Sequence, residues 1–182
     1  MRWVFHTQRI SSDLKDSVKN LRLEDTLVEL LAQIPFASVG ELKAFLTPSL
    51  HNVEPPENIR HLSEAVQLIN DACQQHKSIA ILSDYDVDGI TSMALLWHCF
   101  HTLGFEFSYF FPNRELEGYG LTERVVDRIL STGKTFDLFI ACDCGTNSIE
   151  AVEKLNAHGA NVIIIDHHQH NRESLPEAII IN

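Results

Sequence analysis

The stretch I-A-I-L-S-D-Y-D-V-D-G-I-T-S, residues 79–92, decides the fold. It opens with four apolar residues bounded by polar ones, which predicts a short buried strand. Apolar residues at helical spacing follow over 90–103, so a helix is expected there. The turn between strand and helix then carries Asp84, Asp86 and Asp88. In extended backbone, alternate side chains point the same way and lie roughly 6 to 7 Å apart. Carboxylates that close repel one another unless protons or a cation neutralise them, so the turn predicts a metal site.

After this unit, apolar segments alternate with helical patterns to the last residue. Such alternation predicts an α/β fold, with a mostly parallel sheet flanked by helices on both faces. The expected strands are 79–83, 105–111, 136–141, 162–165 and 178–181. The expected helices of this part are 57–76, 90–103, 122–130 and 147–158.

The start of the chain is expected to form a separate helical lead segment. Leucines over 21–31 fit one side of a helix loosely, and a short helix is expected over 40–46. Three prolines within 47–57 indicate a connector. The predicted domains are therefore a lead and connector, 1–56, and the sheet-containing domain, 57–182.

Composition and charge limit the class of protein. A chain of 182 residues with 45% hydrophobic and 21% charged residues is ordinary for a soluble globular protein. It has no run near the roughly 20 apolar residues of a membrane span and no signal-peptide core at its start, so we expect a cytoplasmic protein with no membrane partner. The four cysteines form no metal-finger spacing and are expected to be buried reduced thiols. The net charge of −11 argues against a free-standing nucleic-acid clamp, but it allows an acidic site offset by cations.

Polar residues follow three of the expected strands, and in parallel sheets chemistry gathers at these carboxyl ends. The first strand is followed by the three aspartates, the third by Asp143, and the fourth by Asp166, His167 and His168. Several carboxylates with one or two imidazoles suit Mn²⁺ or Mg²⁺. The absence of a cysteine–histidine cage argues against structural zinc.

Each part of this set also has a plainer interpretation. Residues 84–89 match the opening of a calcium loop, D-x-D-x-D-G, but Leu95 stands where that loop needs Glu, and a strand precedes it instead of a helix. The turn would otherwise be a helix cap with surplus acids, Asp143 a turn residue, and the histidine pair surface groups. His98 and His101 are expected to be packing or helix-surface residues.

The ordered motifs D-Y-D-V-D-G-I-T-S (84–92), C-D-C-G (142–145) and D-H-H (166–168) together resemble the DHH phosphoesterase superfamily. Within it, the match is closest to exonucleases specific for single-stranded DNA. Two further stretches support this, F-P-N-R with E-G-Y-G-L over 111–121 and A-I-I-I-N over 178–182.

The resemblance covers about residues 25–182 and has one departure. Residues 144–147 read C-G-T-N, where the family more often has N-G-I-S or C-G-I-S. Asp143 and Gly145 are retained, so the site is expected to survive.

The resemblance implies a two-metal site. By resemblance, Asp86 binds one metal ion, Asp88 and His167 bind the second, and Asp143 bridges both. Asp84 would be a further ligand or a base that holds metal-bound water.

The remaining implied roles concern the substrate. His168 would contact the scissile phosphate and Asp166 would orient the histidines. Arg114 is the candidate for a second phosphate contact, because its guanidinium suits bidentate binding. A surface salt bridge is the plainer role for Arg114.

The implied reaction is 5′-to-3′ hydrolysis of single-stranded DNA to mononucleotides, in DNA repair and recombination. A single-strand-binding protein or a helicase would be a partner. In this family a fourth Asp ligand and a second lobe lie beyond the D-H-H motif. Because the sequence stops at Asn182, we expect an incomplete catalytic domain that binds metal weakly and hydrolyses DNA poorly or not at all.

Three alternatives stay open. Other DHH phosphodiesterases, which act on oligonucleotides or cyclic dinucleotides, usually carry a histidine where Leu82 stands. A haloacid-dehalogenase-like phosphatase would use Asp86 as nucleophile, but also needs a later Lys and paired acids. A non-catalytic DHH scaffold would tend to have lost the carboxylates.

Overall fold

The computed structural model describes residues 23–31, 33–34, 36–170 and 174–182. The chain divides between Glu54 and Pro55 into two units, and each is described by itself. None of the helices in these ranges combines the length and the apolar character that a membrane span requires. The catalytic role assigned to residues 57–182 stays a prediction.

The first unit contains two short helices, α2 (Asp25–Leu31) and α3 (Val39–Leu46), followed by the 3₁₀ turn η1 (Leu50–Asn52). Ser38 begins α3, and its hydroxyl accepts a hydrogen bond from the Glu41 amide at 3.1 Å. The α3 helix occupies the range expected from the sequence, whereas Leu21 lies outside the described residues. The unit buries a small apolar cluster of Leu31 and Leu42, surrounded by Leu23, Val28, Phe36, Val39 and Leu46.

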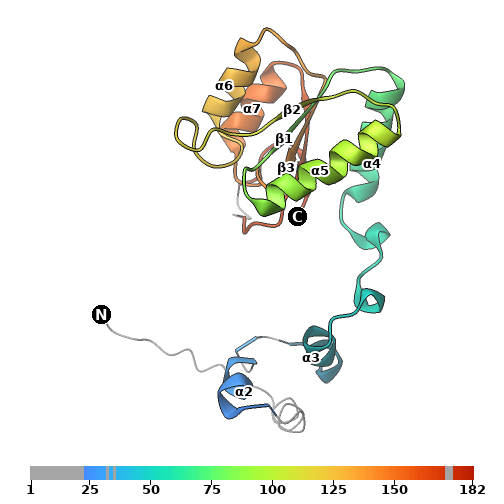
Figure 1. Ribbon diagram of the computed structural model, residues 1–182, viewed down its shortest axis with the longest axis vertical. Coiled ribbons are helices and arrows are strands. Elements are labelled where there is room, and N and C mark those ends of the chain that lie inside the picture. Colours follow the sequence, from blue (N-terminus) through green and yellow to red (C-terminus); the bar gives the residue numbers. More distant parts are fainter. Residues whose placement is uncertain (1–22, 32, 35, 171–173) are drawn as a thin grey trace. The chain divides into compact units, whose positions relative to one another are not determined.

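The second unit is built on a five-stranded parallel sheet with the order β2-β1-β3-β4-β5 (Figure 1). The strands are β1 (Ile79–Ser83), β2 (Ser108–Phe110), β3 (Leu138–Cys142), β4 (Asn161–Ile165) and β5 (Ile179–Ile181). This confirms the predicted α/β fold. β2 is shorter than predicted, because it is an edge strand that pairs only with β1.

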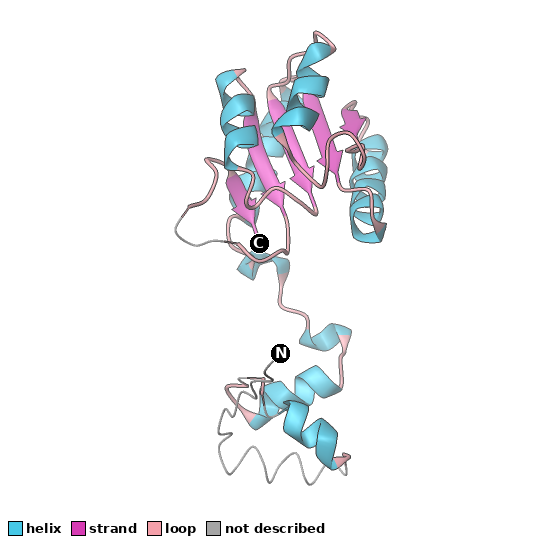
Figure 2. Ribbon diagram, turned by 90° about the vertical axis from the view of Figure 1, so that its left-hand side faces the viewer, coloured by secondary structure: helices cyan, strands magenta, loops and turns pink. Residues whose placement is uncertain are grey.

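Helices cover both faces of this sheet, so the unit has three layers (Figures 1 and 2). The turn η2 (Pro56–Asn58) leads to α4 (Leu62–Gln74), which shares one face with α5 (Val87–Thr102). The other face is covered by α6 (Glu123–Ser131) and α7 (Ile149–Ala157).

Alternate strand residues feed these two apolar layers, as the period of an extended strand requires. Ile81 and Ile140 belong to the layer with α4 and α5, whereas Leu82 and Ala141 belong to the layer with α6 and α7. All four side chains are fully buried. The two central strands β1 and β3 therefore read as continuous apolar runs in the sequence.

The connections that follow the central strands β1 and β3 lead to neighbouring strands on opposite sides of this central pair. The chain passes from β1 through α5 to β2, and from β3 through α7 to β4 on the other side. Open parallel sheets carry a crevice at the carboxyl ends of two such neighbouring strands. The register pairs Ser83 with Cys142 and Cys142 with Ile165, so the segments that follow β1, β3 and β4 start at the same level of this edge.

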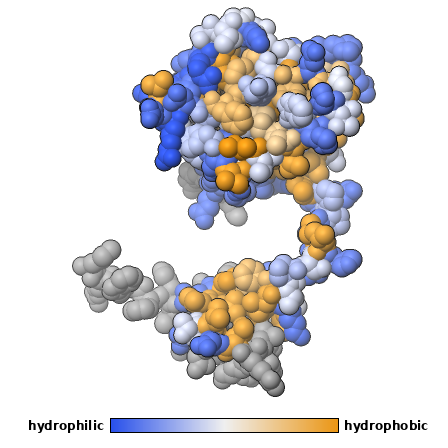
Figure 3. Space-filling model, viewed as in Figure 1, coloured by the Kyte–Doolittle hydropathy of each residue, from blue (hydrophilic) through white to orange (hydrophobic). Residues whose placement is uncertain are grey.

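The α5 helix carries apolar side chains both on the side that packs on the sheet and on the side that faces solvent. Met93 and Phe100 are buried, whereas Leu95 is 73% exposed, and apolar side chains are visible over α5 on the face shown in Figure 3. The ring of His101 stacks on Trp97 with centroids 4.9 Å apart, a surface packing role as expected.

All four cysteines are free, and three are buried: Cys73, Cys142 and Cys144. The prediction of four buried thiols is wrong for Cys99, which lies on the exposed side of α5.

Candidate metal centre

The turn after β1 places its three carboxylates in three different environments. Asp84 is completely buried at the end of β1. Asp86 is the N-cap of α5, where its Oδ1 accepts a hydrogen bond from the Gly89 amide at 3.0 Å. Asp88 lies exposed in the first turn of α5. The expected extended spacing is therefore wrong for Asp88, because α5 begins at Val87 and the backbone is already helical there.

Gly89 brings α5 onto the end of β1. A Cβ at this position would lie 2.2 Å from the carbonyl oxygen of Asp84, so no larger residue fits. The Ser83 hydroxyl ties the same junction together by donating to the Gly89 carbonyl oxygen at 2.6 Å. The close approach fixes the first turn of α5 at the carboxyl edge of the sheet.

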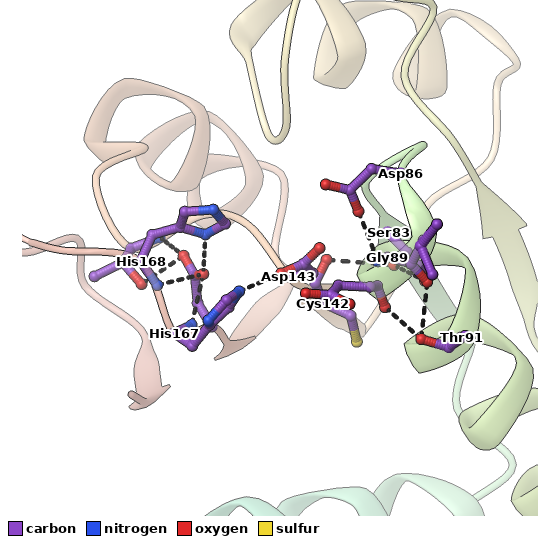
Figure 4. Close-up of polar contacts among 12 residues, drawn as sticks. Ser83, Asp86, Gly89, Thr91, Cys142, Asp143, His167 and His168 are labelled. Carbon is purple, nitrogen blue, oxygen red and sulfur yellow. Dashed lines mark hydrogen bonds and ion pairs between the residues drawn. The ribbon is translucent and has the colours of Figure 1, made fainter. Parts of the chain in front are cut away.

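Asp143 follows β3 with its backbone in the left-handed region, at φ +58°. A non-glycine residue in this conformation costs of order 1–3 kcal/mol, and such strain clusters at functional sites. The Asp143 amide donates to the Ile165 carbonyl oxygen at 2.8 Å, and the carboxylate oxygen Oδ1 lies 3.0 Å from His167 Nε2. Figure 4 shows Asp143 between the histidine pair on one side and Asp86 with Gly89 on the other.

Three side chains form a group of metal-ligand type. Among the described residues, Asp143, His167 and His168 each offer one ligand atom, and these atoms lie within 4.8 Å of one another. The three aspartates of the first turn belong to no such group. Asp88, Asp143 and His167 nevertheless line one pocket of about 370 Å³, together with Thr91, Ser92, Ile165, Asp166, Ile181 and Asn182.

Asp166 holds the loops after β3 and β4 together. Its Oδ1 accepts hydrogen bonds from the His167 amide (2.8 Å), the His168 amide (3.1 Å) and His168 Nδ1 (2.7 Å). Its Oδ2 accepts from the amide and the hydroxyl of Thr146, at 3.1 and 2.7 Å. Burial alone would raise the pKa of Asp166, but these hydrogen bonds outweigh it and lower the pKa to about 2.

Thr146 and Asn182 belong to this network, and sequence reasoning gave neither a role. The Asn182 side-chain amide donates to Thr146 Oγ1 at 3.1 Å and to the His168 carbonyl oxygen at 2.9 Å. Thr146 lies within the segment that departs from the family pattern, so the departure supplies a hydrogen-bond donor to Asp166.

Tyr119 is a further residue of the site that the sequence did not single out. Its hydroxyl lies 3.0 Å from His168 Nε2, and the two rings meet edge to face with centroids 5.9 Å apart. Burial, followed by the charges of Asp84 and Asp143, raises the pKa of Tyr119 well above its ordinary value. The only sequence signal was its place in the E-G-Y-G-L stretch.

An ion pair between buried Glu117 and exposed Arg128 anchors the loop that carries Tyr119. Glu117 is 8% exposed; its Oε1 accepts from Arg128 Nε, and its Oε2 accepts from the Asn113 amide at 2.7 Å. Arg128 also donates to the Phe111 carbonyl oxygen at 2.9 Å. The part of the loop that precedes Tyr119 is therefore fixed to α6.

Several carboxylate oxygens of the site accept no hydrogen bond from the described residues. Both oxygens of Asp84 and Oδ2 of Asp143 are buried with no hydrogen-bond partner among the described residues. Burial raises the pKa of Asp84 and of Asp143, and the neighbouring Asp86 raises both further. Unpartnered buried carboxylate oxygens beside an imidazole are a donor set that a hard divalent cation satisfies, so these residues fit a bound metal.

One predicted residue, Arg114, lies apart from this group. The guanidinium carbon of Arg114 lies 5.6 Å from the centroid of the Tyr85 ring, a cation–π contact, and Arg114 is exposed. Tyr85 in turn packs edge to face on Tyr119, with centroids 6.3 Å apart. Among the described residues, Arg114 reaches His168 through the rings of Tyr85 and Tyr119, and its phosphate contact stays a prediction.

Comparison with known proteins gives one family and a consistent set of relatives. The family described as "DHH family, N-terminal domain" matches residues 78–182. The single-stranded-DNA-specific exonuclease RecJ of Bacillus subtilis is 30% identical over 178 residues, covering 97% of this chain and 22% of the relative. RecJ of Thermus thermophilus is 35% identical over 123 residues, covering 67% of this chain and 18% of the relative. A crystal structure of exonuclease RecJ bound to manganese superposes with a TM-score of 0.61 at 33% identity, covering 68% of this chain and 31% of that one. The chain thus spans about a fifth of the length of these two RecJ relatives.

Proposed function

Because the chain belongs to the DHH family, as the motifs indicated, we propose that it supplies the metal-binding edge of an exonuclease that degrades single-stranded DNA. One observation carries the proposal: the cluster of Asp143, His167 and His168 lies at the carboxyl edge of the sheet beside buried carboxylate oxygens without partners. The RecJ relatives are named for the same activity, and a solved relative is described as bound to manganese.

We assign Mn²⁺ or Mg²⁺ to this edge, held by Asp86, Asp88, Asp143 and His167. The shared pocket of Asp88, Asp143 and His167 supports their common role, and the interaction between Asp86 and Asp143 supports the first site. Asp84, buried behind them, is a further ligand or a base. When bound, two such ions lower the pKa of a water molecule and neutralise charge that develops on the phosphate.

The remaining residues orient the phosphodiester. Asp166 hydrogen-bonds Nδ1 of His168 and raises the pKa of His168, which favours a positive charge on that ring. A charged imidazole donates a strong hydrogen bond to a phosphate oxygen. We therefore assign the scissile phosphate to His168, with Asp166 as its positioning residue and Arg114 as a second phosphate contact.

The finer features of the proposal follow from the relatives. We propose that digestion runs from the 5′ end and releases mononucleotides, in the cytoplasm, and that a single-strand-binding protein or a helicase delivers the substrate. The net charge of −11 means that cations must offset the acidic edge before DNA can approach it.

The test is hydrolysis of 5′-labelled single-stranded DNA by the product of the complete reading frame that encodes these residues. We expect Mn²⁺-dependent release of labelled mononucleotide, little cleavage of a blunt duplex, and loss of activity in Asp143→Asn. Asp127→Asn, an exposed carboxylate on α6, is the matched control and should retain activity. Hydrolysis that persists in EDTA or in Asp143→Asn would refute the proposal.

A further inference from the structure

His168 has two chemical roles open to it at this edge. One ring nitrogen of His168 lies within 4.8 Å of ligand atoms of both Asp143 and His167, so the ring is close enough to complete a metal site. A histidine whose Nδ1 bonds a carboxylate is also typical of metal ligands, since the carboxylate orients the ring. His168 has this arrangement, with Asp166 Oδ1 at 2.7 Å.

The other nitrogen of the ring is already engaged. Nε2 of His168 lies 3.0 Å from the Tyr119 hydroxyl, and the rings are nearly perpendicular at 81°. If the ring is neutral, Nε2 has its one free lone pair, and that lone pair accepts the tyrosine proton. If the ring is protonated, Nε2 carries a hydrogen that the tyrosine oxygen accepts, so in both states the contact competes with a metal ion for Nε2. His167 differs, because its Nε2 faces Asp143 directly and its side chain is 68% exposed.

The loop around Tyr119 is built to hold this hydroxyl in place. Gly118 and Gly120 flank it at φ +88° and +69°, and a Cβ on Gly120 would lie 3.0 Å from the Cβ of Cys144. Glu117 fixes the loop to Arg128, and Tyr85 packs edge to face on the Tyr119 ring. The hydroxyl position is thus set by backbone and packing on three sides.

We propose that Tyr119 is a positioning residue that keeps His168 out of the metal coordination and reserves its Nε2 for the substrate phosphate. This deepens the proposed function and rests on it, because it requires metal binding at Asp143 and His167. It predicts that the two neighbouring histidines act differently: His167 binds metal and His168 does not, until the Tyr119 hydroxyl is removed.

The test is a double-mutant cycle of metal binding, with Co²⁺ as the probe because its visible spectrum reports ligand number and type. Affinity and spectra are measured for the 182-residue chain and for Tyr119→Phe, His168→Gln and the double variant. Phe keeps the ring that packs on Tyr85 while deleting the hydroxyl. Tyr109→Phe, a 59% exposed tyrosine on β2, is the matched control.

We expect His168→Gln alone to change Co²⁺ affinity by less than about twofold. Tyr119→Phe should tighten binding by about tenfold, the lower end of what ligand-shell changes cause, with a spectral change that the double variant abolishes. Loss of affinity in His168→Gln would overturn the proposal, and this result does not depend on how well Tyr119→Phe folds. An unchanged affinity and spectrum in a folded Tyr119→Phe would overturn it as well.

The cycle separates this inference from the proposed function. Asp143→Asn should weaken Co²⁺ binding strongly in every background. If Asp143→Asn leaves binding unchanged, the metal site itself is refuted and both proposals fall. If Asp143→Asn abolishes binding and the cycle shows no coupling between Tyr119 and His168, only the role of Tyr119 is refuted.

Discussion

The ion pair between Glu117 and Arg128 should stabilise the fold in a strongly pH-dependent way. The Glu117 side chain is 7% exposed and accepts one hydrogen bond from the Arg128 guanidinium and one from the Asn113 amide. Hydrogen bonds to charged groups contribute about 1.5–3 kcal/mol each, and Arg128 is 43% exposed and can regain water. We therefore expect Glu117→Gln to lower the free energy of unfolding by about 2 kcal/mol at pH 7.

Acid should remove this difference. Burial alone would raise the pKa of Glu117, but the hydrogen bonds from Arg128 and Asn113 outweigh it and lower the pKa. A lowered pKa in the folded state means that the contribution is complete above the ordinary glutamate pKa and is lost as pH falls through the lowered value. The gap between wild type and Glu117→Gln should accordingly shrink as the pH falls below the ordinary glutamate pKa of 4.5 and through the lowered value.

Urea unfolding at several pH values measures this gap. Glu115→Gln, on the same loop but exposed, is the matched control and should change stability by less than about 0.5 kcal/mol. A cycle with Arg128→Met should recover most of the loss as coupling between the two residues. A Glu117→Gln variant as stable as wild type at pH 7, or a stability difference that does not shrink on acidification, would contradict the role assigned to the ion pair.

Three further predictions concern the site. Gly89→Ala should destabilise by about 3 kcal/mol in urea unfolding, because its Cβ meets backbone at 2.2 Å, whereas Gly40→Ala in α3 meets only an ordinary contact and should not. Asp86→Ala should lower both Tm and Mn²⁺ affinity, while Asp86→Asn should keep the helix cap and lose only affinity, measured by calorimetry. Asp166→Asn should cost at least about 2 kcal/mol, since an amide NH₂ must face at least one donor that the carboxylate now accepts, and Asp127→Asn is the exposed control. Equal stability of the two asparagine variants would contradict the hydrogen-bond network around Asp166.

The features that could be predicted from the sequence are those that follow from the periodic spacing of apolar residues. Strands and helices alternate clearly, and Asp143 and His167 were expected to meet because they follow neighbouring parallel strands. The environments of Asp84, Asp86 and Asp88 could not be predicted from the sequence. Helix α5 begins inside their motif, so the backbone at Asp88 is helical instead of extended. Tyr119 could not be placed, because it lies on a loop with no period, whose course depends on an ion pair to a residue eleven positions from Glu117.

The strand order has a consequence for how the chain folds during and after its synthesis. β1 can pair with β2 soon after both are synthesised, but its other edge waits for β3, whose Cys142 pairs with Ser83 across 59 positions of chain. Until then a strand that the folded protein buries completely has an unpaired edge, and such edges promote association between nascent or refolding chains. Pairings this distant also slow folding. Dilute conditions or chaperone assistance should therefore raise the yield of folded protein more than any single stabilising substitution.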